Sequence, residues 1–187
     1  MNNVFDEIYK NKTWACGNVL SGAGSDPYSA KDYVTYLNQF KDRCVLDLGC
    51  GDLSLYSNNI FFKSYIGVDV VDIQKYKNLP PDVQIVCSTI EEFDFHGYKF
   101  DLILIKDVLQ HLSNNRICNI LNILSNLNTE CVITNDFNFD DKNEDCVDGD
   151  HHYLNLELDP FNLKIKSKYD WQSYFDSRLK QTIVCYG

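Results

Sequence analysis

The chain has 187 residues, of which 44% are hydrophobic and 24% are charged. This balance is typical of a globular domain that buries a full core, and it excludes intrinsic disorder for most of the chain. The 27 acidic residues outnumber the 17 Lys and Arg residues, so the formal net charge is −10. Because a field of that sign repels phosphate backbones and anionic lipid surfaces, we expect neither nucleic acid nor a membrane as a partner.

The sequence also predicts neither a secretion signal nor a membrane span. Its start lacks a basic stretch followed by an apolar run, and no apolar run approaches the roughly 18 residues of a membrane helix. The eight cysteines include no C-x-x-C pair, which is the spacing typical of structural zinc sites. We therefore expect reduced thiols in a cytoplasmic protein.

Short apolar segments alternate with helical or irregular segments along most of the chain. The predicted strands are residues 44–48, 64–69, 83–87, 100–105 and 131–134. Their continuous apolar character indicates strands that are covered on both faces. One helix is expected at residues 27–40, and another after Ser113, which would cap it. Strands that alternate with helices predict a parallel sheet with right-handed crossovers.

The last part of the chain has a different pattern. Residues 136–150 are rich in Asp and Glu and almost free of apolar side chains, which predicts a long surface loop. Residues 161–165 and 181–186 are expected to form two closing strands, joined through the aromatic segment 169–175. We expect a single domain, in which residues 1–40 form a lid and a helix on a core of residues 41–187.

The first predicted strand runs into a turn that contains Gly49 and Gly51. Glycines at that point let the backbone turn sharply and let a ligand approach the main chain. Asp69 ends the second predicted strand, 18 residues after Gly51, where a carboxylate can accept hydrogen bonds from a ribose diol. A plain strand-to-helix turn is the alternative, but this context favours a nucleoside ligand.

The residues around the turn bear on which nucleoside binds. A dinucleotide site usually has a third glycine, so that a helix N-terminus can approach the pyrophosphate. This chain has Ser54 there, and Asp47 and Asp52 flank the turn. S-adenosylmethionine (SAM) has no phosphate and carries an ammonium and a sulfonium group, so an acidic turn suits it better than NAD.

Residues 45–52 resemble the first motif of the class I SAM-dependent methyltransferases, and Asp69 matches the acidic residue of the second motif. The resemblance implies a Rossmann-like, doubly wound α/β fold with a mostly parallel seven-stranded sheet, a reversed C-terminal hairpin and helices on both faces. It also implies the positions of cofactor groups. The methionine moiety would lie over Gly49 and Gly51, the ribose at Asp69 and Val70, and the adenine near Ser88 and Thr89.

A narrower resemblance extends over nearly the whole chain. Tyr9 with Trp14, and residues 21–25, 106–113 and 143–163, are similar to a group of small bacterial and viral methyltransferases. Several members of that group are associated with the synthesis of surface polysaccharides or glycans. The resemblance implies a small-molecule or glycan acceptor, with SAM as methyl donor and S-adenosylhomocysteine as product, and leaves the oligomeric state open.

The segment before the first long helix has the composition of a flexible lid. Ser21, Gly22, Gly24 and Ser25 would offer backbone amides to the carboxylate of the cofactor. Trp14 either stacks on a ligand or fills the core, and both interpretations stay open.

Catalysis is expected beyond the carboxyl ends of the strands, where α/β sheets bind ligands. This rule places Lys106 and Asp107, and also Asn135 and Asp136, in the cleft. Asp107 and His111 are four residues apart, so on a helical turn they share one face and would form a general base for a hydroxyl acceptor. A structural role for both is the alternative.

Two further candidates concern the acceptor side. Of the adjacent His151 and His152, at most one can face the acceptor, because neighbouring side chains of an extended chain point apart; we take His151 as a catalytic candidate. Asp107, Asn135 and Asp136 also resemble the oxygen ligands of Mg²⁺-dependent O-methyltransferases. Mg²⁺ is therefore an open second cofactor.

Methylation of DNA bases is excluded, because it would need an Asn/Asp-Pro-Pro-Tyr/Phe or Pro-Cys segment where this chain has Lys106 and Asp107. Three other functions are compatible with these residues. The leading hypothesis is a SAM-dependent methyltransferase that O-methylates a sugar hydroxyl, on a nucleotide-sugar or glycan, by in-line transfer. The alternatives are N- or carboxyl-methylation of a small metabolite or peptide, and a SAM-binding module without turnover.

Overall fold

The computed structural model describes residues 4–55, 62–76, 78, 83–140 and 142–186. Within them the chain forms one seven-stranded sheet of order β3-β2-β1-β4-β5-β7-β6. The strands are β1 Cys44–Leu48, β2 Ser64–Asp69, β3 Gln84–Cys87, β4 Leu102–Lys106, β5 Glu130–Asp136, β6 Ser167–Gln172 and β7 Leu179–Tyr186. The first five pair in parallel, whereas β7 is antiparallel to both β5 and β6. The predicted fold class, a mostly parallel sheet with a reversed C-terminal strand pair, is confirmed.

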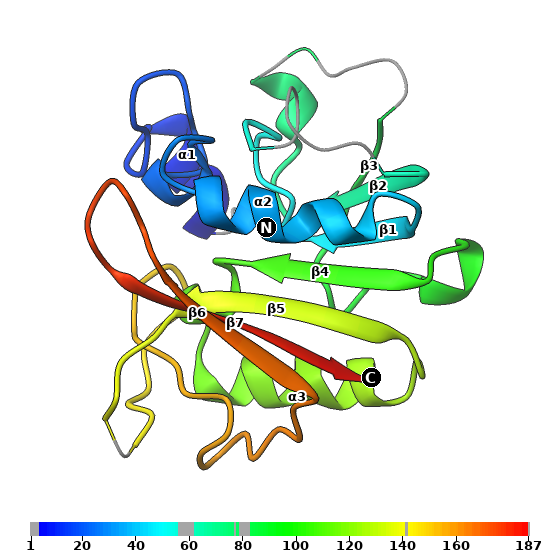
Figure 1. The fold of residues 1–187 in the computed structure, drawn as a ribbon. Helices are drawn as coiled ribbons and strands as arrows, with labels where there is room; N and C mark the ends of the chain where they lie inside the picture. The colour runs from blue at the N-terminus through cyan, green and yellow to red at the C-terminus, as the bar shows by residue number, and fades with distance from the viewer. Residues whose placement is uncertain (1–3, 56–61, 77, 79–82, 141, 187) are drawn as a thin grey trace.

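Helices lie on both faces of the sheet (Figure 1). The α-helices are α1 Val4–Lys10, α2 Lys31–Leu37 and α3 Asn114–Ser125. Single turns of 3₁₀ helix occupy Ala23–Ser25, Asn38–Phe40, Ile73–Lys75, Phe95–Gly97 and Leu109–His111. The helix expected at residues 27–40 is therefore shorter than predicted and ends in a 3₁₀ turn. Among the described residues, no helix has the length and apolar character needed to cross a bilayer.

The core consists of one apolar layer on each face of the sheet. Successive side chains of β4 point to opposite faces of the sheet. Ile103 and Ile105 therefore contact the layer under α3, while Leu102 and Leu104 contact the layer under α2. All four are fully buried. Strands with both faces covered need apolar residues at every position, which is why the sequence shows continuous runs there.

The C-terminal strand pair differs from the prediction. Residues 161–165, expected as a strand, form no strand, and the strand that pairs with β7 is β6. In β6 only Trp171 is buried, where its ring stacks on Tyr33 of α2 with 6.1 Å between centroids. Phe161, Leu163 and Ile165 are half-buried against the α3 layer instead. Their apolar character reflects packing of a loop rather than a strand.

The acidic segment is held against α3. Ser113 precedes the helix as predicted, but its side chain makes no capping hydrogen bond. Asp145 Oδ1 accepts the amide of Asn114 at 2.7 Å, and Asp148 Oδ1 accepts the amide of Ser113 at 2.9 Å. Carboxylates at this place also oppose the positive end of the helix dipole. Asp141, part of the acidic segment, lies outside the described residues.

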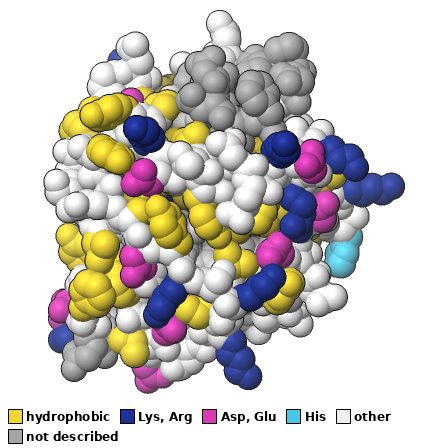
Figure 2. Space-filling model, in the orientation of Figure 1, with side chains coloured by type: hydrophobic (Ala, Val, Ile, Leu, Met, Phe, Trp, Pro, Cys, Tyr) yellow, Lys and Arg dark blue, Asp and Glu magenta, His cyan; other side chains and the backbone are white. Residues whose placement is uncertain are grey.

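The surface in Figure 2 carries Lys and Arg side chains interspersed with Asp and Glu. No separate basic patch is visible on that face. Opposite charges therefore alternate on that face instead of forming separate regions.

We predict that Leu104→Ala lowers the free energy of unfolding by about 2–5 kcal/mol, because it leaves a cavity in the layer under α2. Urea unfolding followed by circular dichroism measures this change. Val147→Ala, at a position that is 69% exposed, is the control and should change it by less than about 0.5 kcal/mol. Equal effects of the two substitutions would contradict the assigned core.

Candidate functional site

A cleft opens at the carboxyl ends of β1, β2 and β4, beneath the N-terminal segment that contains α1 (Figure 1). It holds about 730 Å³ of space free of protein atoms, including open solvent at its mouth. Its place matches the rule that α/β sheets bind ligands beyond the carboxyl ends of their strands. Twelve of the predicted site residues line it: Trp14, Ser21, Ser25, Gly49, Gly51, Asp69, Val70, Ser88, Thr89, Lys106, Asp107 and His111.

The turn after β1 forms the floor of the cleft. Gly49 has a φ of +81°, and a Cβ built on it would lie 2.2 Å from Val108 Cγ2. A larger residue is therefore excluded by both conformation and space. The amides of Gly49 and Cys50 donate to the carbonyl of Val68, at 2.7 and 3.1 Å, and tie the turn to β2. The Asp47 carboxylate lies behind this turn, where it accepts the Tyr65 hydroxyl at 2.6 Å and lines an adjoining small cavity rather than the cleft.

Asp52 fixes the N-terminal loop to the turn. Its fully buried carboxylate accepts the Leu20 amide and the Ser21 hydroxyl, both at 2.9 Å. Because Ser21 lines the cleft, this pair of bonds determines where the expected cofactor loop begins. In the sequence Asp52 stands out only as an acidic residue beside the turn.

Asp69 presents a buried carboxylate at the end of β2. Its oxygens accept the amides of Gly51 and Val71, each at 2.9 Å. Burial raises the pKa of Asp69 to about 6, although these two hydrogen bonds lower it. Each carboxylate oxygen can accept more than one hydrogen bond, so Asp69 retains capacity for a ligand hydroxyl. Beside it, the Ser88 amide donates to the Asp69 carbonyl at 2.9 Å, which places Ser88 and Thr89 at the same end of the cleft.

Lys106 joins the N-terminal loop to the end of β4. Its Nζ donates to the Gly24 carbonyl at 2.7 Å and to Asp107 Oδ2 at 2.5 Å. A Cβ on Gly24 would lie 2.6 Å from Asp107 Oδ2, so the loop approaches as closely as it does only because residue 24 is glycine. Gly24 and Gly22 themselves do not line the cleft. Burial lowers the pKa of Lys106 despite the Asp107 charge beside it.

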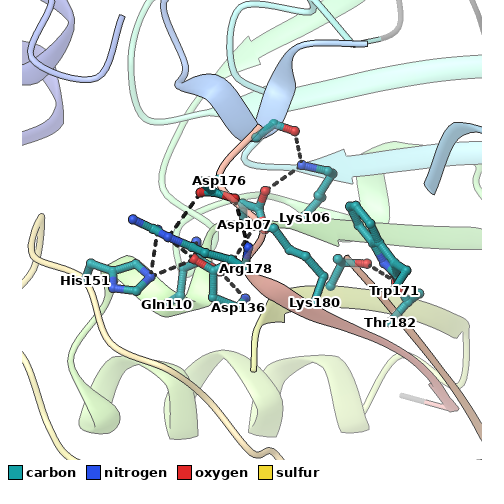
Figure 3. A network of polar contacts seen from close by, with 12 residues as sticks. Lys106, Asp107, Gln110, Asp136, His151, Trp171, Asp176, Arg178, Lys180 and Thr182 are labelled. Carbon is teal, nitrogen blue, oxygen red and sulfur yellow. Dashed lines mark hydrogen bonds and ion pairs between the residues drawn. The ribbon is translucent and has the colours of Figure 1, made fainter. Parts of the chain in front are cut away.

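An ion network centred on buried Lys180 and Asp136 lies at this edge of the sheet (Figure 3). Lys180 Nζ of β7 lies 2.7 Å from Asp107 Oδ1 and 2.5 Å from Asp136 Oδ1. Asp136 Oδ2 also meets Arg178 Nη1 at 2.9 Å and His151 Nε2 at 2.8 Å. Burial alone would raise the pKa of Asp107, but Lys106 and Lys180 outweigh it and lower that pKa.

This network does not fit the Mg²⁺ site expected from Asp107, Asn135 and Asp136. The Lys180 ammonium stands between the two carboxylates, Lys106 pairs with Asp107, and Arg178 pairs with Asp136. A divalent cation there would meet these positive charges at short range. No group of three or more His, Cys, Asp or Glu side chains in the described part of the chain is arranged to hold a metal. The residues at these strand ends therefore do not fit a magnesium ion.

His111 is partnered by a backbone carbonyl rather than by Asp107. Its Nδ1 lies 2.8 Å from the Asp150 carbonyl oxygen, which can only accept, so the ring carries its proton on Nδ1 and has a lone pair on Nε2. Its face contacts Trp14, with 4.4 Å between centroids. Burial lowers the pKa of His111 to about 4, which keeps the ring neutral at pH 7.

The two adjacent histidines point apart. His151 is exposed to solvent and joins the ion network, with its ring centroid 5.7 Å from that of His111. His152 is buried, and its Nδ1 contacts the Glu144 carbonyl at 2.6 Å. His151 lies beside the cleft rather than in its lining.

Sequence reasoning missed several residues that line the cleft. They are Phe5, Tyr9, Val68, Ile90, Val108, Leu112 and Arg116. For Tyr9 the sequence offers only a resemblance, and burial raises the pKa of its hydroxyl well above the usual range. Arg116 gives no local signal, because a single arginine on an amphipathic helix normally faces solvent.

Comparisons with known proteins bear on the fold of the chain. The methyltransferase domain family matches residues 46–124, and no curated protein sequence shows significant similarity to the chain. The 1,6-didemethyltoxoflavin-N1-methyltransferase of Burkholderia thailandensis, crystallised with S-adenosylhomocysteine, superposes with a TM-score of 0.66 at 14% identity, over 96% of this chain and 84% of that one. The N-methyltransferase NodS of Bradyrhizobium japonicum gives a TM-score of 0.59 at 13% identity, over 96% and 98%.

A third solved structure is that of a methyltransferase with a different acceptor. The magnesium protoporphyrin IX methyltransferase of Synechocystis, with bound SAM, has a TM-score of 0.52 at 16% identity, over 83% of this chain and 76% of that one. At such identities the likeness concerns the fold, and the acceptors of these enzymes differ from one another. The methyltransferase domain match covers less than half of the chain, and with the strand order it shows the fold that the SAM-dependent methyltransferases share.

Proposed function

We propose that the protein transfers the methyl group of SAM to a hydroxyl group of a sugar, on a nucleotide-sugar or a glycan. The observation that carries this proposal is the neutral His111 ring in the cleft, whose Nδ1 is held by the Asp150 carbonyl and whose Nε2 is left with a lone pair. A hydroxyl acceptor needs a group that removes its proton, and an oriented neutral imidazole can do so.

The cleft has the groups that SAM requires. Asp69 offers a buried acceptor for the ribose hydroxyls, with Val70 beside it, and Ser88 and Thr89 lie where the adenine would reach. At the other end, Gly49 and Gly51 bring the backbone close to the methionine part, while Ser21 and Ser25 line the cleft near Lys106. This Lys106 ammonium suits the methionine carboxylate, and Gly22 and Gly24 shape the loop that holds it.

When bound, SAM would supply a methyl group activated by its sulfonium. The electrons of the broken C–S bond would stay on the sulfur of S-adenosylhomocysteine, and the acceptor oxygen would bond to the methyl carbon. The residues of the chain act on the acceptor. His111 Nε2 takes the hydroxyl proton, and its pKa of about 4 keeps it unprotonated beforehand at neutral pH. Asp107, which is engaged by two lysines, positions Lys106 instead of acting as a base.

A row of rings supports a sugar as the acceptor. It begins in the cleft with Trp14 and His111 and continues through His151 to Tyr153, with centroids 4.4, 5.7 and 5.3 Å apart. Arg178 lies at its edge, 3.4 Å from His151 Nε2. Aromatic faces cover the apolar side of a sugar ring, while planar charged groups bind its hydroxyls. We assign His151 to this acceptor surface.

The N-terminal segment fits the role of a lid. Phe5, Tyr9 and Trp14 line the cleft from above, and Phe5 contacts the Trp14 indole edge-on, with 6.0 Å between centroids. A lid of this kind excludes water from the reacting groups. We retain the division into residues 1–40 as lid and helix and residues 41–187 as methyltransferase core.

N-methylation of a small metabolite is the second candidate. Two structural neighbours are N-methyltransferases by name, and a neutral amine needs no base before it attacks the methyl group. The two candidates therefore differ in how strongly turnover depends on His111. Carboxyl methylation shares this low dependence, and a SAM-binding module without turnover would give no methylated product at all.

The affinity for SAM should fall as the pH is lowered through about 6. Ribose hydroxyls donate to the ionised Asp69, so protonation of a group whose pKa is raised to about 6 removes the better acceptor. Because about nine tenths of Asp69 is ionised at pH 7 and only about one tenth at pH 5, the affinity for the cofactor should be about tenfold lower at pH 5. Calorimetric titration with S-adenosylhomocysteine measures it. Asp69→Asn should bind at least about tenfold more weakly at pH 7 and show no such pH dependence.

His111→Asn keeps a donor for the Asp150 carbonyl and removes Nε2. With a sugar acceptor, kcat should fall by about 10²- to 10⁴-fold, the usual contribution of a general base, while the Kd for S-adenosylhomocysteine changes less than about threefold. Methyl-transfer assays against nucleotide-sugars and simple amines provide the comparison. If turnover on an amine is high and insensitive to this substitution, the N-methyltransferase alternative replaces the proposal.

Excess EDTA should leave turnover unchanged, because Lys106, Arg178 and Lys180 already pair with the carboxylates that a metal would need. Assays with and without added Mg²⁺ measure this. Loss of activity in EDTA that Mg²⁺ restores would reopen the magnesium site.

A further inference from the structure

Arg116 of α3 forms an ion cluster at the adenine end of the cleft. Its guanidinium binds both oxygens of Glu91, at 2.7 and 3.0 Å, and Nη1 binds Asp148 Oδ2 at 2.7 Å. The hydrogen bond to Glu91 is the main cause that raises the pKa of Arg116, so the side chain is charged at every relevant pH. Arg116 also lines the cleft.

The two carboxylates belong to segments far apart in the sequence. Glu91 follows Ser88, Thr89 and Ile90 directly, and we call residues 88–92 the nucleobase loop, because its first three residues line the cleft. Asp148 begins residues 148–152, which we call the support loop. A single guanidinium therefore connects the wall of the proposed adenine site with the last part of the acidic segment.

The support loop determines how His111 is held. The Gly149 amide donates to the His111 carbonyl at 2.8 Å, and the His152 amide donates to the Gln110 carbonyl at 3.0 Å. Between them, the Asp150 carbonyl accepts from His111 Nδ1 at 2.8 Å. The loop thus lies along the 3₁₀ turn Leu109–His111 and sets the tautomer of the ring.

We propose that Arg116 is a positioning residue that couples the nucleobase loop to the support loop, so that binding of the adenosine part of the cofactor orders the carbonyl that orients His111. This inference rests on the proposed function, in which His111 Nε2 is the base. It gives the cofactor a second role, since a bound nucleobase would fix the orientation of the His111 ring before the acceptor binds.

The chemistry of arginine suits this role. A guanidinium binds one carboxylate with two parallel hydrogen bonds and still has a donor for a second carboxylate. A lysine has one compact ammonium and would not fix the angle between Glu91 and Asp148. The side chain of Arg116 is 28% exposed, and those of Glu91 and Asp148 are 26% and 32% exposed, so the cluster is partly shielded from water.

The chain contains a matched cluster at a distance from the cleft. Arg43 binds Asp101 at 2.7 Å and Glu130 at 3.0 Å, and its side chain is 32% exposed. It likewise joins two segments through one guanidinium, but it does not line the cleft. Arg43→Met is therefore a control for the loss of an arginine and two ion pairs at similar exposure.

The test uses hydrogen–deuterium exchange of the support loop at saturating S-adenosylhomocysteine. In the wild type and in Arg43→Met, we expect the ligand to slow exchange of the amides of residues 148–152 by about tenfold or more. In Arg116→Met this ligand-dependent slowing should be lost while the protein stays folded, and Arg116→Lys should restore only part of it. Retention of the full effect in Arg116→Met, or equal loss in Arg43→Met, would overturn the proposal.

A spectroscopic measurement separates positioning from simple stability. The ¹⁵N shifts of the His111 ring report its tautomer, and with ligand bound we expect the Nδ1-protonated form in the wild type and in Arg43→Met. Arg116→Met should show a mixture of tautomers, and an unchanged single tautomer would count against the coupling.

The result is distinguishable from failure of the proposed function. If the ligand slows exchange of the support loop only when Arg116 is present, but no sugar is methylated, the coupling stands and the acceptor assignment fails. If sugars are methylated but the ligand does not change hydrogen–deuterium exchange of the support loop, the acceptor assignment stands and the coupling fails.

Discussion

The ammonium of Lys180 is the interaction on which the architecture of the site depends. At the carboxyl edge of the sheet, β4 and β5 end beside the carboxylates of Asp107 and Asp136, and the antiparallel β7 begins beside them with Lys180. A buried carboxylate is tolerated there only with a partner. By binding Asp107 and Asp136 together, Lys180 joins the end of β4 to the end of β5. Asp107, whose backbone has a φ of +56°, then directs its second oxygen to Lys106, and Lys106 fixes the N-terminal loop at Gly24.

The strands of the parallel sheet and the cofactor end of the cleft could be predicted because their signals are local. A strand covered on both faces is apolar at every position, and a glycine turn beside a ligand needs residues such as Gly49 within a short motif. β6 could not be predicted in this way, since it is an exposed strand with one buried side chain, Trp171. The apolar segment 161–165 resembles a strand in sequence because packing of a loop requires the same residues.

The acceptor side was harder to predict because its contacts join residues distant in the chain. Asp107 and His111 stand at helical spacing, which suggests a pair, yet Asp107 meets Lys180 from β7 and His111 meets a carbonyl of the support loop. A spacing rule describes neighbours on one helix, whereas here the turn between them is a 3₁₀ helix that begins after Asp107. The acidic segment likewise finds its partners in the first amides of α3 and in Arg116.

The exposed strand β6 has a consequence for how the molecule meets others. It is the last strand of the sheet on its side, and Lys168 and Asp170 are among its exposed side chains. Lys168 is paired with Glu157 at 2.6 Å, so charge lies along a border whose free backbone groups would otherwise accept a further strand. Charged edge strands resist such addition. Growth of the sheet from one molecule to the next is thereby discouraged on this side.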